Sequence, residues 1–178
     1  MTGIPRAFVA VVPPPAVLDA VEAHLRAASF AGWRESRRQQ WHLTLEFLGR
    51  VDDADDEVER LATIGAGLAP FVVRLGGAGA FPDVRNASVA WLGVAEGARE
   101  LGGFATLVRS LGADRFHPHL TVARTSRRRD ATTLVATLDA PTVGPSWEVD
   151  AVELIASDTH PSGARSTTIA RLSLSGAH

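Results

Sequence analysis

The chain has 178 residues, of which 46% are hydrophobic, so it can build the core of one domain or of two small lobes folded together. It has no cysteine and no run of eighteen apolar residues, which excludes disulfides, thiolate metal sites and a membrane-spanning helix. The formal net charge is −2. The N-terminal apolar run lacks the cleavage site of a secretory signal peptide, so we expect a cytoplasmic protein.

Charges are segregated along the chain. All eighteen basic residues are arginine, and several of them precede or follow two histidine-containing segments. Acidic residues gather instead between positions 52 and 59. Such segregation can produce a positive cleft on a protein whose net charge is slightly negative.

The first quarter of the chain predicts a strand, a helix and a second strand. β-forming residues indicate a buried strand over 6–12, and apolar residues at helical spacing indicate a helix over 16–28. The polar, basic stretch 32–40 is expected to be a loop, and 41–48 alternates as a strand. One predicted face of that strand carries Trp41, Leu43, Leu45 and Phe47, and the other carries His42, Thr44, Glu46 and Leu48.

The rest of the chain repeats this succession and then closes with strands. The expected elements are a helix over 52–69, a strand over 70–75, a glycine- and proline-rich turn over 76–86, a strand over 87–94, a helix over 99–111, a strand over 116–124, a basic loop over 125–130, a short helix over 131–138 and strands over 147–156 and 166–174. Strands mixed with helices favour an α+β fold, and no linker divides 1–178 into independent domains.

Two motifs share the tripeptide His-Leu-Thr. The first lies within 41–49 (WHLTLEFLG) and the second within 116–124 (FHPHLTVAR). Residues i and i+2 of a strand share a face, so His42 stands beside Thr44 and His119 beside Thr121. Two such strands side by side would place two imidazoles and two hydroxyls around one cavity.

This set of groups suits phosphodiester cleavage without a metal. A neutral histidine can accept a proton from water while a protonated histidine donates one to the leaving oxygen, because the ordinary histidine pKa lies near 6.5. Threonine hydroxyls can bind the phosphate oxygens, and Arg124 can add a positive charge. Arg124 has the opposite strand parity from His119, so a regular strand would require it to reach the phosphate from the strand's end. A single His-x-Thr in a strand usually has no catalytic role; the matched pair favours one.

The motif pair resembles the two-histidine (2H) phosphoesterase superfamily, specifically the RNA 2′,3′-cyclic phosphodiesterases, also called 2′-5′ RNA ligases. The matching segments are 42–49 (HLTLEFLG) and 118–124 (PHLTVAR), with weaker matches at 6–13, 79–82 and 89–94. The resemblance implies a bilobal α+β fold with two pseudo-symmetric lobes, whose antiparallel sheets flank a central cleft. The family often has a C-terminal tyrosine that this chain lacks; the corresponding region contains Ser157, Gly163, Arg165 and Ser166.

The resemblance also implies the roles of residues. His42 and His119 would be the catalytic pair, Thr44 and Thr121 would bind the phosphate, and Arg124 would be the active-site arginine. The reaction would open a 2′,3′-cyclic phosphate to a 2′-phosphomonoester, with His42 as the acid that protonates O3′ and His119 as the base. The sequence does not fix that order of roles. No cofactor is expected.

Other residues have weaker claims to a role. Phe8 and Trp33 are candidates for stacking a nucleobase, whereas Trp41 and Phe47 are expected in the core. The arginines Arg127, Arg128 and Arg129 form either a solvated loop or contacts to RNA phosphates. A zinc site would have to combine histidines alone, namely His42, His117, His119 and His160, and has no recognisable ligand spacing.

Three functions remain open from the sequence. The first is hydrolysis of RNA 2′,3′-cyclic phosphate ends, and the second is ATP-independent joining of RNA ends through a 2′-5′ linkage at the same site. The third is a non-catalytic nucleotide- or RNA-binding module, against which the intact histidines and threonines argue. The expected partner is RNA or a nucleotide with a 2′,3′-cyclic phosphate end, no membrane is involved, and we expect a monomer.

Overall fold

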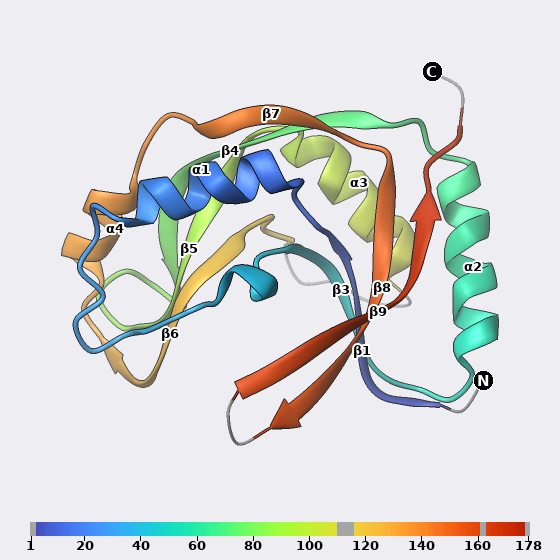
Figure 1. Ribbon diagram of the computed structural model, residues 1–178, viewed down its shortest axis with the longest axis horizontal. Helices are drawn as coiled ribbons and strands as arrows, with labels where there is room; N and C mark the ends of the chain where they lie inside the picture. The colour runs from blue at the N-terminus through green and yellow to red at the C-terminus, as the bar shows by residue number, and fades with distance from the viewer. Residues whose placement is uncertain (1–2, 110–115, 161–162, 177–178) are drawn as a thin grey trace.

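Antiparallel strands dominate the protein's computed structural model, which describes residues 3–109, 116–160 and 163–176 (Figure 1). In chain order its elements are β1 (Ile4–Val11), α1 (Pro15–Leu25), β2 (Arg34–Glu35), the 3-10 helix η1 (Arg38–Gln40), β3 (Leu43–Val51), α2 (Ala54–Ala66), β4 (Phe71–Phe81), β5 (Ala87–Glu96), α3 (Ala98–Val108), β6 (Leu120–Arg129), α4 (Thr132–Leu138), β7 (Val143–Val149), β8 (Ala151–His160) and β9 (Gly163–Ser173). The strands of the described residues pair in the order β7-β4-β5-β6-β3-β1-β8-β9, and β2 pairs with β6. The predicted α+β class is confirmed.

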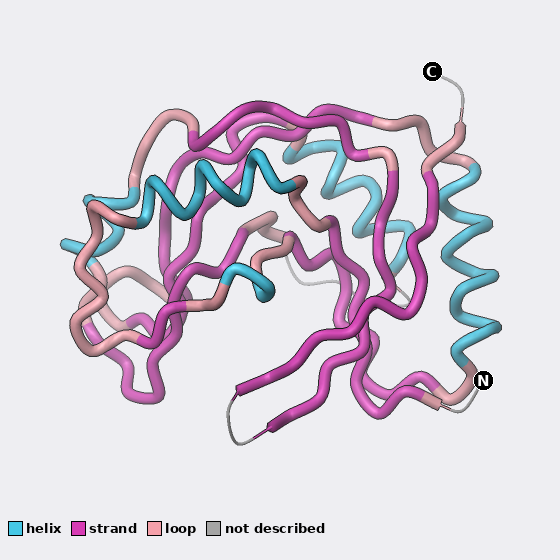
Figure 2. The backbone as a smooth tube through the Cα atoms, viewed as in Figure 1, coloured by secondary structure: helices cyan, strands magenta, loops and turns pink. Residues whose placement is uncertain are grey.

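The sheet consists of two lobes that meet between β6 and β3 (Figures 1 and 2). One lobe contains β7, β4, β5 and β6, and the other contains β3, β1, β8 and β9. The predicted repeat is confirmed: strand, helix and motif strand occur once as β1-α1-β3 and once as β5-α3-β6. Each connecting helix packs against the opposite lobe, α1 on β7 and α3 on β3. The seam is narrow, because β3 and β6 pair only through Leu43 and Leu120.

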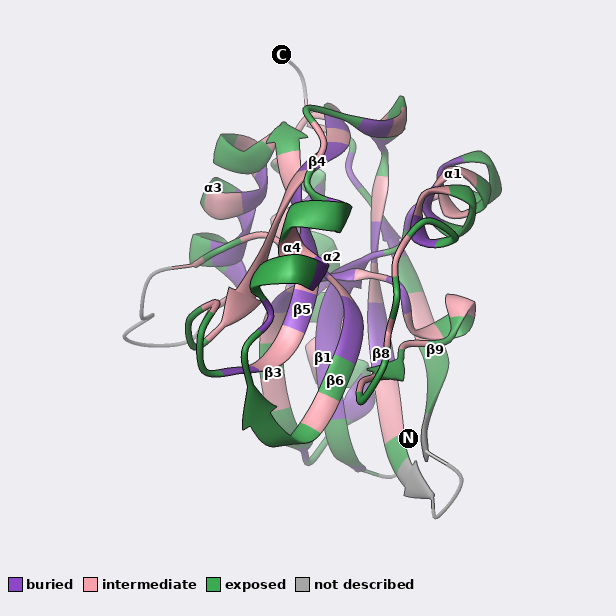
Figure 3. Ribbon diagram, turned by 90° about the vertical axis from the view of Figure 1, so that its left-hand side faces the viewer, coloured by how far each residue is buried: buried purple, intermediate pink, exposed green. Residues whose placement is uncertain are grey.

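The core follows from the alternation of side chains along these strands. Val9, Leu43, Leu92 and Leu120 are inaccessible to solvent, and the helices cover them with their own apolar faces, leaving polar faces outside (Figure 3). Asp53 caps α2 by accepting hydrogen bonds from two backbone N–H groups of its first turn, and three acidic residues of that turn lie at the positive end of the helix dipole. No helix in the described ranges is long and apolar enough to cross a membrane.

Pairing with neighbouring strands overrides the local turn and loop signals at several places. The predicted turn 76–86 is wrong in its first half, since β4 continues through its glycines to Phe81. A Cβ on Gly79 would lie 2.3 Å from ring atoms of Trp91, so glycine here admits an indole beside the backbone. The predicted loop 125–130 is also wrong, because β6 continues to Arg129, which pairs with Ala87.

Two further boundaries differ from the predictions. The expected loop 32–40 contains β2 and η1, and β2 pairs with β6. The expected strand 147–156 is two strands: β7 lies at one end of the sheet order, and β8 lies next to β9 at the other end. In each case a partner strand far away in sequence supplies the hydrogen bonds, which local composition does not reveal.

The predicted faces of β3 are wrong beyond Leu45. Thr44 pairs with Ala10 and Glu46 with Val9, so Leu45 has no partner and forms a one-residue bulge. A shift of one residue exchanges the two faces of a strand. Phe47 consequently leaves the core face and is 72% exposed, on the same side of the sheet as His42 and Thr44. Trp41, which precedes the bulge, is buried as expected.

Candidate active site

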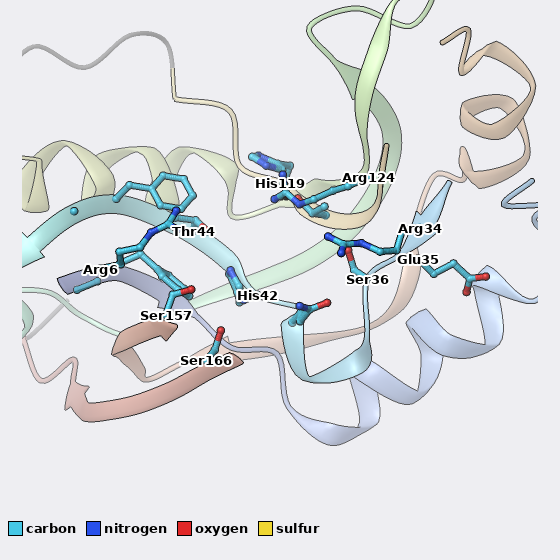
Figure 4. A pocket seen from close by; sticks show the side chains of 16 residues that line it. Arg6, Arg34, Glu35, Ser36, His42, Thr44, His119, Arg124, Ser157 and Ser166 are labelled. Carbon is cyan, nitrogen blue, oxygen red and sulfur yellow. Dashed lines mark hydrogen bonds between the residues drawn. The ribbon is translucent and has the colours of Figure 1, made fainter. Parts of the chain in front are cut away.

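The two motifs face each other across the seam between the lobes. Leu43 and Leu120 are antiparallel partners; His42 and Thr44 flank the first, and His119 and Thr121 flank the second. All four polar side chains line one cavity of about 560 Å³ (Figure 4). Each lobe thus contributes one histidine and one threonine to the cavity, so a small anion there can be reached from both lobes.

His119 is held by its backbone and by aromatic neighbours. Its Nδ1 lies 2.8 Å from the carbonyl oxygen of His117, and an N–H at Nδ1 donates to that oxygen. This tautomer leaves Nε2 as the nitrogen that exchanges protons in the cavity. The edge of Phe81 packs against the ring at a centroid distance of 4.9 Å, while His117 itself packs against Trp91 and does not line the cavity.

His42 is held by Phe8. The two rings stack with their centroids 4.7 Å apart and their planes 29° from parallel. Phe8 is only 5% exposed, because it packs with Ala10 and Ile155 on the cleft side of the sheet. The imidazole of His42 thus covers one face of the Phe8 ring, so Phe8 positions His42.

The surroundings of both histidines favour the neutral form of the imidazole. Burial, together with the smaller effects of the nearby charges of Arg124 and His119, lowers the pKa of His42 to about 4. Burial also lowers the pKa of His119, against the effect of its hydrogen bond to the His117 carbonyl. A bound phosphate would counter these effects, because a negative charge close to an imidazole favours the protonated form.

Arg124 reaches the cavity because β6 contains a bulge. Thr121 pairs with Trp91 and Ala123 with Ala90, which leaves Val122 without a partner on β5. The extra residue returns Arg124 to the side of Thr121, whose Oγ1 lies 3.5 Å from the guanidinium. The expectation that Arg124 would reach from the end of the strand is wrong, since β6 continues for five residues beyond it.

The cavity contains several residues that the sequence did not single out. Phe47 was placed in the core, and Arg6, Arg34, Ser36 and Gln40 were given no role, yet all five line the cavity. Ser157 and Ser166, which pair across β8 and β9, line it too, in the region where the family often has a tyrosine. Only a bulge, which no local sequence signal marks, distinguishes Phe47 from a core residue.

Other candidate residues lie elsewhere. Trp33 packs against the core, and Arg127, Arg128 and Arg129 are exposed at the end of β6; none of these four lines the cavity. Among the described residues, no group of three or more histidines, cysteines and acids is arranged to hold a metal ion. The side chain of His160, and His178, lie outside the described part of the chain.

Comparison with known proteins gives a consistent assignment. Residues 13–161 match the 2′-5′ RNA ligase superfamily. A protein of Thermus thermophilus named RNA 2′,3′-cyclic phosphodiesterase is 35% identical, with 97% of this chain and 92% of the relative covered. The crystal structure of TT0787 from the same species superposes with a TM-score of 0.70 at 31% identity, covering 97% of this chain and all of that one. The crystal structure of Escherichia coli LigT complexed with 3′-AMP superposes with a TM-score of 0.74 at 27% sequence identity, and the match covers 97% of this chain and 99% of LigT.

These matches extend over both lobes and both histidine motifs, and they agree with the resemblance carried by the two His-Leu-Thr segments. The chain belongs to the 2′-5′ RNA ligase superfamily.

Proposed function

We propose that the protein hydrolyses RNA 2′,3′-cyclic phosphate ends to 2′-phosphomonoesters. The observation that carries this proposal is the arrangement at the seam, where the histidine and the threonine of both motifs line one cavity. The relatives named RNA 2′,3′-cyclic phosphodiesterase support the same reaction. Every group the chemistry needs comes from one chain, so we propose that a monomer is active.

In the proposed mechanism, neutral His119 accepts a proton from water as the water oxygen attacks phosphorus. The bond from phosphorus to O3′ breaks, and protonated His42 donates its proton to O3′. His119 ends protonated and His42 neutral, and exchange with solvent restores both. The carbonyl of His117 favours this assignment, because an acceptor at Nδ1 stabilises the imidazolium that the base becomes.

The remaining polar groups act on the phosphate. The hydroxyls of Thr44 and Thr121 donate to its non-bridging oxygens, where negative charge increases in the transition state. Arg124 supplies a fixed positive charge beside Thr121. Its pKa is lowered by burial, and by the neighbouring Arg34, but guanidinium remains charged at any physiological pH. The exposed ring of Phe47 offers a face to the nucleobase.

The same groups also allow ATP-independent joining. A 5′-hydroxyl in place of water would give a 2′-5′ linkage by the same proton transfers, and the superfamily to which the chain belongs carries the name of that reaction. Incubation with tRNA halves separates the two outcomes. Hydrolysis leaves a 2′-phosphate end, whereas joining gives a longer RNA whose new linkage resists a 3′-5′-specific nuclease.

The proposal is tested by turnover of an oligoribonucleotide ending in a 2′,3′-cyclic phosphate. We expect His42→Ala and His119→Ala each to lower turnover by about 10²–10⁴-fold, the usual contribution of one positioned acid or base. His24→Gln is a control, since His24 bonds the Leu138 carbonyl away from the cavity. Near wild-type turnover by a folded His42 or His119 variant would remove that histidine from the mechanism, and binding without turnover by the wild type would favour the binding module.

A further inference from the structure

Arg34 is built into the wall of the cavity beside Arg124. The two residues are antiparallel partners on β2 and β6, and both line the cavity. The backbone N–H of Ser36 donates to the carbonyl of Val122, which continues the pairing of this short segment with β6. Figure 4 shows the Arg34 side chain directed toward Arg124.

A second contact fixes the loop that carries Arg34. Arg129 donates a hydrogen bond of 2.9 Å to the carbonyl of Ala31. Its guanidinium also occupies the space where a Cβ on Gly32 would stand, and Gly32 has the positive φ of 78° that favours glycine. These contacts of Arg129 hold the loop before β2 against the end of β6, and the loop in turn fixes the position of Arg34.

Glu35, which pairs with Ala123, also lines the cavity, but among the described residues it forms no salt bridge with Arg34 or Arg124. Two guanidinium groups on neighbouring strands repel each other, so an anion bound beside them is favoured. Among the residues that the structure describes, no carboxylate forms a salt bridge with Arg34. A cyclic phosphodiester carries a single negative charge, and Arg124 together with one imidazolium is sufficient to neutralise it. Arg34 adds a further positive charge, which can bind a second anionic group of the substrate.

We propose that Arg34 binds a second phosphate of the RNA, the one that links the terminal nucleotide to its 5′ neighbour. This inference rests on the proposed function, because it takes the terminal phosphate to lie between the two histidines. Every RNA substrate carries that second phosphate on the same ribose as the cyclic phosphate, whereas a 2′,3′-cyclic mononucleotide lacks it. Arg34 therefore makes the enzyme prefer RNA ends to free cyclic nucleotides, and it has no part in the proton transfers.

The test compares three substrates with wild type, Arg34→Gln and the control Arg26→Gln, which removes the same charge from a position that does not line the cavity. The substrates are a 2′,3′-cyclic mononucleotide, a dinucleotide ending in the same cyclic phosphate, and that dinucleotide with a neutral methylphosphonate linkage. We expect Arg34→Gln to lower kcat/KM about tenfold on the charged dinucleotide only, as for a partly exposed charge-assisted contact. It should also reduce the log–log salt slope of dinucleotide binding by about 0.7.

The outcomes separate this inference from the proposed function. Wild-type turnover of the mononucleotide tests the proposed function alone. A similar loss on all three substrates would overturn the inference by assigning Arg34 to the scissile phosphate or to the placement of Arg124, and no loss on the charged dinucleotide would overturn it directly. A loss confined to the joining of tRNA halves would overturn it too, by assigning Arg34 to the strand that brings the 5′-hydroxyl.

Discussion

Phe47 and Arg124 occupy equivalent positions in the two lobes. Each lies five residues after the histidine of its motif, and each follows a one-residue bulge, at Leu45 in β3 and at Val122 in β6. The bulges reverse the strand parity, so both side chains join the cavity wall. The same kind of β-bulge thus occurs in both lobes and directs the ring of Phe47 and the guanidinium of Arg124 into the cavity wall.

Phe47→Ala is expected to impair substrate binding and to leave stability nearly unchanged. The ring is 72% exposed, so its removal opens no cavity, and the free energy of unfolding should change by less than about 1 kcal/mol. KM for a cyclic nucleotide should rise about tenfold, in line with the loss of one base–aromatic stack. Urea unfolding and steady-state kinetics measure the two effects. A loss of about 3–5 kcal/mol in stability would instead indicate the core position that simple alternation predicts.

Arg124 and the arginines that follow it should differ in their effects. Arg124→Gln should lower kcat even for a 2′,3′-cyclic mononucleotide, by roughly 10²-fold, because the scissile phosphate is present in that substrate. Arg127→Gln and Arg128→Gln should matter, if at all, only for longer RNA, since neither residue lines the cavity. Kinetics on both substrate classes decide between these roles. Undiminished turnover by Arg124→Gln would take that residue out of the site.

The pH dependence should differ between kcat/KM and kcat. Burial lowers the pKa of both histidines in the free enzyme, to about 4 for His42, whereas a bound phosphate favours their protonated forms. Both profiles should be bell-shaped, since one histidine must be neutral while the other is charged, and their limbs belong to the coupled pair. The kcat optimum should lie at higher pH than the kcat/KM optimum. A rate that only rises with pH to a plateau would exclude the acid role.

Activity should survive chelation. The two imidazoles carry out both proton transfers, and the threonines and Arg124 stabilise the phosphate charge, so the proposed mechanism contains no step for a metal. Dialysis against EDTA followed by the cyclic-phosphate assay tests this expectation. Activity that is lost in EDTA and restored by zinc would instead support the histidine-only zinc site.

The sequence predicts the parts of this fold that depend on local pattern. The helix at 131–138, the acidic start of α2 and the duplicated strand–helix–strand unit are all confirmed. The shared faces of His42 with Thr44 and of His119 with Thr121 also follow from i, i+2 spacing, because both pairs precede the bulges.

The errors arise where distant segments decide the structure. The bulge at Leu45 depends on how β3 pairs with β1, and the bulge at Val122 depends on how β6 pairs with β5. The residues next to each bulge in the sequence therefore do not predict it. The same holds for β2, whose two residues are a strand only because β6 lies beside them. Arg34 could not be distinguished from its neighbours Arg37 and Arg38 in the sequence, since the pairing partner alone turns it toward the cavity.

In the proposed mechanism two histidines open a 2′,3′-cyclic phosphate by expelling O3′. Its most direct test is phosphorus NMR of the product formed from a 2′,3′-cyclic mononucleotide, with wild type and with the His42→Ala and His119→Ala variants. We expect the cyclic-phosphate signal to be replaced by that of a 2′-phosphomonoester with wild type alone. A 3′-phosphomonoester, or equal conversion by either histidine variant, would contradict it.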